Sequence, residues 1–310
     1  MGYAVVLGEA LIDLLDGECG GERVYRQVVG GGPLNVAVGL ARLGADVQFV
    51  GSVGDDALGT RIRGFVEGAG VGQRGMVTVP APTALAVATF AGAEPEFRFY
   101  GEPPSYGLLG PDDLDVALIE AADVLYCGSI ALLCPPALAA ARRAWALTPA
   151  LRVFDPNVRP SLLPGTGAVD ELRAVVAEFA AGAHLVKLSV ADLAVLYPDL
   201  PVEDAAARLR ALGAEAVVVT LGANGALVAA GGAAVRVPAP EVSAVDATGA
   251  GDSVMAALSA DLLADGPVPD PSAWPDRVAF ALRVAGLVCE SPGGAVSMPT
   301  RAQVAARFPA

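Results

Sequence analysis

The chain has 310 residues, 54% of them hydrophobic and 17% charged, and a formal net charge of −14. It lacks an uninterrupted apolar run of about 18 residues, which excludes a membrane-spanning helix, and its basic residues are scattered, which argues against a nucleic-acid surface. The four cysteines form no C-x-x-C pair and His184 is the only histidine, so a disulfide framework, a His-centred triad and a multi-histidine metal site are disfavoured.

Apolar runs typical of buried strands alternate with helical segments along the chain. The first run opens the sequence without the basic segment of a signal peptide, so we expect a cytoplasmic protein. Continuous apolar strands separated by helices predict a mostly parallel sheet covered by helices on both faces. The expected strands are 3–7, 46–53, 123–127, 151–154, 184–188 and 215–220. The expected helices are 35–43, 57–68, 135–147, 169–181, 203–212, 250–264 and 275–289.

Two stretches in the first third interrupt this alternation. Residues 10–30 are typical of a hairpin with a Gly-Gly turn, and residues 83–100 predict a second strand pair with its turn at 92–95. We interpret them as a small β-lid over the carboxyl ends of the strands, where open α/β sheets bind ligands. The lid comprises 10–32 and 83–108 within a single domain, 1–310. Its strand edges suit a homodimer formed through the lid, although a monomer can cover such edges with loops.

A glycine-rich stretch, G-G-G-P-L-N at 30–35, leads into the helix expected at 35–43. One interpretation is a loop that feeds a helix capped by Asn35. The other is a backbone that comes close to a ligand, with the amide of Asn35 offering a donor and an acceptor to a sugar hydroxyl. The stretch is not a G-x-G-x-x-G fingerprint, and the chain has no G-x-x-x-x-G-K-[ST] loop. A bound nucleotide would therefore be held in another way.

Two more glycine motifs lie in the last third. T-L-G-A-N-G at 220–225 follows a strand, and it predicts either a simple hairpin turn or a nucleotide loop. D-A-T-G-A-G-D at 246–252 stands at the start of an apolar helix, where each glycine costs about 1 kcal/mol relative to alanine. Either Thr248 or Asp252 caps this helix, or the amides at 249–251 face an anion at the positive helix end, with Asp252 as the base.

The order of these motifs, with Asp13 near the end of the first strand, resembles that of the ribokinase-like (PfkB) carbohydrate kinases over essentially the whole chain. Within the family, G-E-A-L-I-D at 8–13 and F-D-P-N-V-R at 154–159 are most similar to fructokinases and 2-keto-3-deoxygluconate kinases. The resemblance implies a ribokinase-like α/β fold. It also implies transfer of the γ-phosphoryl group of ATP, with Mg²⁺, to a primary hydroxyl of a small sugar. Fructose is the first candidate; 2-keto-3-deoxygluconate, ribose and nucleosides are the alternatives.

The resemblance also implies roles for particular residues. The catalytic base would be Asp252, with an anion hole at Gly249, Ala250 and Gly251. Sugar ligands would be Asp13, Gly31, Gly32, Asn35, Arg98, Tyr100 and Arg159. The nucleotide side would include Lys187, Ser189, Thr220, Gly222, Gly225 and Gly251. A K⁺ site would involve Asp246, Thr248, Ser291, Gly293 and Ser297. Asp192 stands, with a shorter reach, where relatives carry a glutamate near the water shell of Mg²⁺, and Leu282 stands where an Asn or His often flanks adenine.

Two rival functions belong to other classes. A non-catalytic sugar or nucleotide sensor on the same fold would have no need of a base such as Asp252. A Rossmann oxidoreductase would need the dinucleotide fingerprint that the chain lacks.

Overall fold

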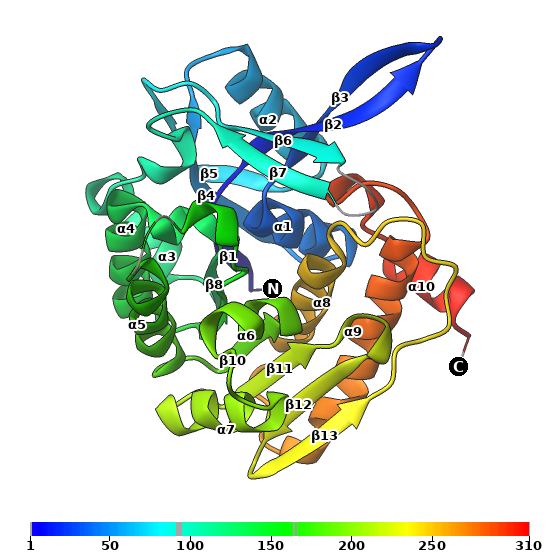
Figure 1. Ribbon diagram of the computed structural model, residues 1–310. Coiled ribbons are helices and arrows are strands. Elements are labelled where there is room, and N and C mark those ends of the chain that lie inside the picture. The colour runs from blue at the N-terminus through cyan, green and yellow to red at the C-terminus, as the bar shows by residue number, and fades with distance from the viewer. Residues whose placement is uncertain (1, 91–94, 164, 166, 310) are drawn as a thin grey trace.

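The computed structural model describes residues 2–90, 95–163, 165 and 167–309 (Figure 1). Within this part of the chain, a nine-stranded sheet has the order β13-β12-β11-β10-β9-β8-β1-β4-β5. The strands from β5 to β11 run parallel, and β12 and β13 are antiparallel to their neighbours. The bounds are β1 (Ala4–Leu7), β4 (Val47–Gly54), β5 (Gly72–Val79), β8 (Val124–Gly128), β9 (Leu151–Asp155), β10 (Leu185–Ser189), β11 (Ala216–Thr220), β12 (Ala226–Ala230) and β13 (Ala233–Val237).

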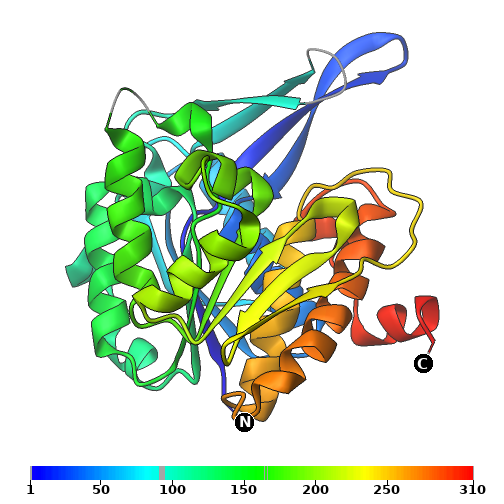
Figure 2. The same cartoon turned by 60° about the horizontal axis from the view of Figure 1, so that its bottom comes forward.

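Helices cover both faces of this sheet, as Figure 2 shows. On β1, Ala4 and Val6 pack into one core and Val5 and Leu7 into the other, because successive side chains of a strand point to opposite faces. The first core is covered by α1 (Gly32–Arg42), α2 (Ala57–Gly68), α8 (Ala250–Asp265), α9 (Trp274–Cys289) and α10 (Arg301–Arg307). The second is covered by α3 (Val116–Glu120), α4 (Pro135–Leu147), α5 (Ala168–Ala180), α6 (Val190–Leu196) and α7 (Val202–Leu212). The expected α/β fold is confirmed.

Helices α1 and α8 approach each other closely because small residues meet where they pack. A Cβ atom on Gly39 would lie only 2.6 Å from the Cβ atom of Ala256. The contact brings the glycine-rich start of α1 beside the glycine-rich start of α8, although the two motifs are far apart in the sequence.

A separate four-stranded sheet, called the lid below, has the order β3-β2-β6-β7. Its strands are β2 (Leu11–Cys19), β3 (Glu22–Gly30), β6 (Leu85–Phe90) and β7 (Pro95–Tyr100), which confirms both predicted strand pairs. Most of the turn expected at 92–95 lies outside the described residues. The β2–β3 hairpin projects beyond the rest of the lid in both views (Figures 1 and 2), and residues 22–27 of β3 are all exposed.

The elements that sequence patterns missed are short or only partly apolar. Strand β5 lies at a sheet edge and begins with G-Q-R-G, and four of the five residues of β13 are exposed. Helices α3, α6 and α10 have five, seven and seven residues, too few to show a helical period. No described helix is long and apolar enough to cross a membrane.

Candidate active site

A cleft of about 280 Å³ opens between the lid and the carboxyl ends of the parallel strands. It lies where the topology of an open α/β sheet predicts a ligand site. Its walls contain most of the side chains that sequence analysis singled out, together with several that it did not. The predicted residues that line it are Asp13, Gly31, Gly32, Asn35, Arg159, Lys187, Ser189, Asp192, Thr248, Gly249, Gly251 and Asp252.

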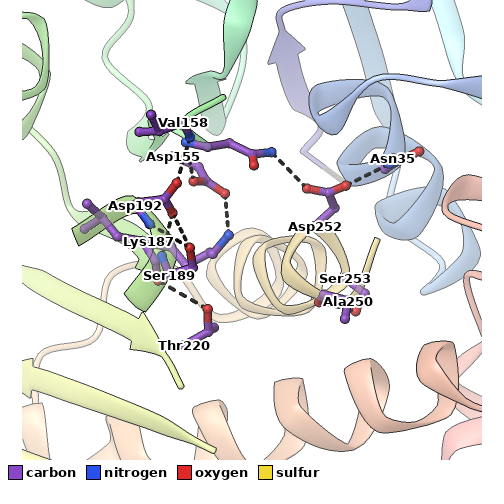
Figure 3. Close-up of polar contacts among 12 residues, drawn as sticks. Asn35, Asp155, Val158, Lys187, Ser189, Asp192, Thr220, Ala250, Asp252 and Ser253 are labelled. Carbon is purple, nitrogen blue, oxygen red and sulfur yellow. Dashed lines mark hydrogen bonds and ion pairs between the residues drawn. The ribbon is translucent and has the colours of Figure 1, made fainter. Parts of the chain in front are cut away.

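Asp252 lies in the first turn of α8 and is 7% exposed. The N-cap of this helix is Gly249, in the left-handed conformation, and no side chain caps it, so the interpretation of Thr248 or Asp252 as a helix cap is wrong. Instead the carboxylate accepts a hydrogen bond from Asn35 Nδ2 at 2.7 Å (Figure 3). It accepts a second one from Asn157 Nδ2 at 3.3 Å. Two amide groups therefore fix the direction of a carboxylate at the positive end of a helix.

Asn35 is buried inside α1, and it does not cap that helix. The N-cap is Gly31, which makes no side-chain cap bond; its φ of 115° and the 2.6 Å that would separate an added Cβ from Glu9 O both require glycine. While Nδ2 of Asn35 binds Asp252, its Oδ1 is buried without a hydrogen-bond partner among the described residues. A buried acceptor without a partner is costly, and a ligand hydroxyl in the cleft would satisfy it.

Asn157 is a site residue whose role the sequence analysis missed, although it quoted the motif F-D-P-N-V-R. It follows β9 and has a φ of 39°, which is uncommon for a residue other than glycine. Arg159 Nη1 donates to Asn157 Oδ1 at 2.6 Å, which leaves Nδ2 to face Asp252. The guanidinium of Arg159 thus orients an amide that in turn orients Asp252.

A buried ion pair lies at the ends of β9 and β10. Lys187 Nζ is 2.7 Å from Asp155 Oδ2, and the two side chains are 3% and 0% exposed (Figure 3). Burial raises the pKa of Asp155 to about 6 although Lys187 opposes this change. Burial also works against the charged form of Lys187, but the carboxylates of Asp155, Asp192 and Asp252 outweigh it and raise the pKa of its amine. The ammonium lies 3.1 Å from where a Cβ atom of Gly251 would stand, so a cation is buried beside the first turn of α8.

Two further carboxyl groups line the cleft below the lid. Asp13 belongs to lid strand β2 and not to the end of the first strand, where we expected it. Glu9, which the sequence analysis did not assign, lies between β1 and β2 and accepts the amide of Ala131 at 3.2 Å. Burial raises the pKa of each group to about 7. The guanidinium of Arg159 lines the same cleft and acts against this rise at both groups.

The residues expected on the nucleotide side lie along the next strand ends. Thr220 ends β11, and its Oγ1 donates to Leu188 O at 3.3 Å. Gly222 and Gly225 form the turn after it, at φ 59° and 87°, and a Cβ on Gly225 would lie 2.0 Å from Val237 O. The turn therefore needs glycine for its own backbone. These three residues lie outside the lining of the cleft cavity.

Ser189 and Asp192 form a capping box at the start of α6. Asp192 Oδ2 accepts from the amide of Ser189 at 2.6 Å and from its hydroxyl at 2.7 Å, and Oδ1 accepts from the amide of Val158 at 2.7 Å. Each oxygen of the carboxylate already has a protein donor, so the carboxylate is held in one orientation.

Asp246 ties the loop before α8 to the loop that follows α9. Its carboxylate accepts from the amide of Thr248 at 2.8 Å and from the amide of Gly293 at 3.0 Å. The hydroxyl of Ser297 donates to Gly293 O and, at 2.8 Å, to Gly294 O. The segments 246–248 and 291–297 are therefore neighbours, and carbonyl, carboxylate and hydroxyl oxygens gather between them.

Three more expected residues lie away from the cleft. Ala86 and Phe99 are paired in the strand register, and both line the cleft. Because side chains alternate along a strand, Arg98 and Tyr100 lie on the opposite face of the lid. Tyr100 is 52% exposed. Leu282 is 5% exposed and packs in the core beneath α9.

Comparisons with known proteins agree with this geometry. The pfkB family of carbohydrate kinases matches residues 1–301. Fructokinase-1 of Zea mays is 34% identical over 316 residues, which cover 97% of this chain and 95% of the maize protein. The structure of a fructokinase from Vibrio cholerae O395 in fructose, ADP and calcium ion bound form matches with a TM-score of 0.87 and 28% identity. The match covers 99% of this chain and 98% of that fructokinase. An aminoimidazole riboside kinase from Salmonella enterica, complexed with aminoimidazole riboside and an ATP analogue, has a TM-score of 0.85, 26% identity and coverage of 99% and 100%. The chain belongs to the pfkB family of carbohydrate kinases.

Proposed function

We propose that this kinase transfers the γ-phosphoryl group of ATP to a primary hydroxyl of fructose. The observation that carries the proposal is Asp252, a carboxylate in the first turn of α8 that two amides aim into the cleft. The maize relative is a fructokinase, and the Vibrio cholerae neighbour binds fructose and ADP, which supports the choice of sugar.

Asp252 would accept the proton of the attacking hydroxyl. The hydroxyl oxygen forms a bond to the γ-phosphorus while the bond from that phosphorus to the bridging oxygen breaks, and ADP leaves with the electron pair. Asn35 and Asn157 hold the carboxylate in place, and general-base catalysis of this kind contributes about 10²–10⁴-fold. The free amides of Gly249, Ala250 and Gly251 at the start of α8 would stabilise the charge that develops on the transferred group.

The sugar would bind between the lid and α1. Asp13, the unpartnered Oδ1 of Asn35 and the close backbone of Gly31 and Gly32 offer acceptors and space for hydroxyl groups. The guanidinium of Arg159 also lines the cleft and could pair with an acidic sugar, so 2-keto-3-deoxygluconate belongs in the substrate panel described below.

A riboside is the second candidate substrate. Phe99 presents an aromatic ring from the lid to the cleft, where it could stack on a base, and the Salmonella enterica neighbour is a riboside kinase. A nucleoside in the substrate panel described below separates the two candidates.

On the nucleotide side, Lys187, Thr220 and the turn of Gly222 and Gly225 would face ATP. When bound with ATP, Mg²⁺ neutralises phosphate charge. The described residues contain no cluster of three acidic, histidine or cysteine side chains suited to a metal, so phosphates and water would supply most of its ligands. Asp192, with its fixed carboxylate, and Ser189 are the side chains that would reach this water shell.

A monovalent cation would bind between the two loops that Asp246 joins. Oxygen atoms from this aspartate and from its neighbours on both loops suit K⁺ in chemical type, and its charge would strengthen the adjacent anion hole. The ligands would come from Asp246, Thr248, Ser291, Gly293 and Ser297.

We further propose a cytoplasmic homodimer joined through the lid. All four cysteines are free thiols, which suits a reducing compartment. The outer part of β3 is a sheet edge with Val24 and Tyr25 exposed, and an isolated hairpin of this kind is marginally stable in water. A second copy would cover it.

The test is an ADP-release assay over fructose, other hexoses, ribose, 2-keto-3-deoxygluconate and nucleosides, with nicotinamide absorbance followed in parallel. We expect ADP release with fructose. Asp252→Asn should lower kcat by at least about 100-fold with fructose and ATP binding nearly unchanged. The matched control is Asp265→Asn, an exposed acid at the far end of α8, which should behave as wild type.

The outcomes separate the rival functions. Near-wild-type turnover by Asp252→Asn would contradict its role as base. ADP release with no member of the panel, despite sugar binding, would favour a sensor. A change in nicotinamide absorbance would favour an oxidoreductase.

A further inference from the structure

The lid hairpin carries an arginine on its cleft side to which the roles above assign nothing. Asp13 lines the cleft, and Leu15 lies on the same face of β2 because side chains two residues apart share a face. The strand register pairs Leu15 with Arg26 of β3, so Arg26 also lies on the cleft side. The neighbouring Gln27 points the other way, where its Oε1 accepts a hydrogen bond from Arg61 of α2 at 3.0 Å.

Arg26 lies close to the loop that precedes the anion hole. The positive charge of Arg26 acts on the carboxylate of Asp246, which also accepts hydrogen bonds from the amides of Thr248 and Gly293. Asp246 directly precedes the turn that leads to Gly249. In both overall views the hairpin projects on the side of the molecule that carries this loop (Figures 1 and 2).

The guanidinium of Arg26 acts on Asp246 only through its charge. Among the residues that the structure describes, none forms a hydrogen bond or an ion pair with it. The two cations that line the cleft have protein partners: Lys187 pairs with Asp155, and Arg159 donates to Asn157. The guanidinium of Arg26 could therefore bind phosphate oxygens without breaking a hydrogen bond or an ion pair within the protein.

We propose that Arg26 binds the phosphate groups of the nucleotide from the lid, opposite the first turn of α8. Arginine suits this role because its planar guanidinium matches phosphate oxygens with two parallel donors. Arg26 lies one pair of residues farther along the hairpin than Asp13, about 7 Å away, so one face of the lid would hold the sugar near its base and the phosphates farther out. The inference rests on the phosphoryl transfer proposed above.

The test compares Arg26→Gln and Arg26→Lys with Arg23→Gln. Arg23 is a matched control because it lies on the same strand but on the opposite face, where it pairs with Asp16. The KM values for ATP and fructose are measured separately by ADP release, and the Kd of ATP is measured by calorimetry. We expect Arg26→Gln to raise the KM and Kd of ATP about 10- to 100-fold, as for a lost charge-assisted hydrogen bond. The KM for fructose should stay within about twofold, Arg26→Lys should be intermediate, and Arg23→Gln should match wild type.

Three outcomes would overturn the proposal. They are an unchanged Kd of ATP in Arg26→Gln, an equal loss in Arg23→Gln, or a loss confined to the KM for fructose. The calorimetric arm does not depend on the acceptor: if wild type binds ATP but phosphorylates no sugar, the proposed function fails while the role of Arg26 is still decided by its Kd.

Discussion

Replacing Glu9 with glutamine should change the way in which stability depends on pH. Glu9 is 1% exposed, and burial raises its pKa from 4.5 to about 7. Because the folded carboxyl group keeps its proton to higher pH than the unfolded one, the unfolded protein binds fewer protons between these values, and stability falls as pH rises through them. Each unit of difference between the folded and unfolded pKa values corresponds to about 1.4 kcal/mol. Above pH 7, ionised Glu9 therefore lowers the free energy of unfolding by about 3 kcal/mol. A glutamine stays neutral, and its oxygen can still accept the amide of Ala131.

The assay is urea unfolding of wild type and Glu9→Gln at several pH values from about 5 to 8. Asp13 and Asp155 also titrate in this range, so the difference between the two proteins, rather than either curve alone, isolates Glu9. We expect the variant to gain about 2–3 kcal/mol relative to wild type as pH rises across this range. Glu18→Gln, at the exposed end of the lid hairpin, should show no such gain. Parallel curves for wild type and Glu9→Gln would refute the reasoning.

Three other predictions concern the sugar, nucleotide and cation parts of the candidate site. Asp13→Asn should raise the KM for fructose about 10-fold or more with little effect on the KM for ATP. The wild-type KM for fructose should rise as pH falls below about 7, because Asp13 then takes up a proton. An unchanged KM for fructose in both experiments would show that Asp13 does not bind the sugar. Gly225→Val should weaken ATP binding more than sugar binding, because the turn has no room for a side chain. A loss of sugar affinity alone would mean that the sugar and nucleotide sides are assigned the wrong way round. Activity in excess Mg²⁺ should rise when K⁺ replaces a bulky organic cation at constant ionic strength, and Asp246→Ala should blunt that rise. A flat K⁺ titration in wild type would leave Asp246 only its structural role.

The main sheet could be predicted because its parallel strands are buried on both sides and therefore read as continuous apolar runs. The cleft could be located because strands end at one edge and glycine motifs follow them. The family resemblance assigned Asn35 and Asp252 to one site, and the structure adds the hydrogen bond between them across 217 positions of the chain. The glycine motifs did not reveal why α1 and α8 come so close. The structure shows that they do so because Gly39 has no side chain.

Other parts of the site depend on information that no local pattern contains. A shift of one residue in strand register moves every side chain to the other face, so the sequence alone could not reveal that Phe99, and not Arg98 or Tyr100, faces the cleft. The role of Asn157 depends on a left-handed backbone and on the guanidinium of Arg159 behind it. Both are products of tertiary packing.

The buried pair of Lys187 and Asp155 has a practical consequence for covalent labelling, because Lys187 is the only lysine in the sequence. Acylating reagents react with neutral amines that reach solvent, and this amine is buried with a raised pKa. It should therefore react only when the ends of β9 and β10 separate from the first turn of α8. Timed exposure to such a reagent, followed by mass spectrometry of the one lysine-containing peptide, would measure how often the floor of the cleft opens. A bound nucleotide should slow that modification, so the chain contains a site-specific reporter of its own occupancy.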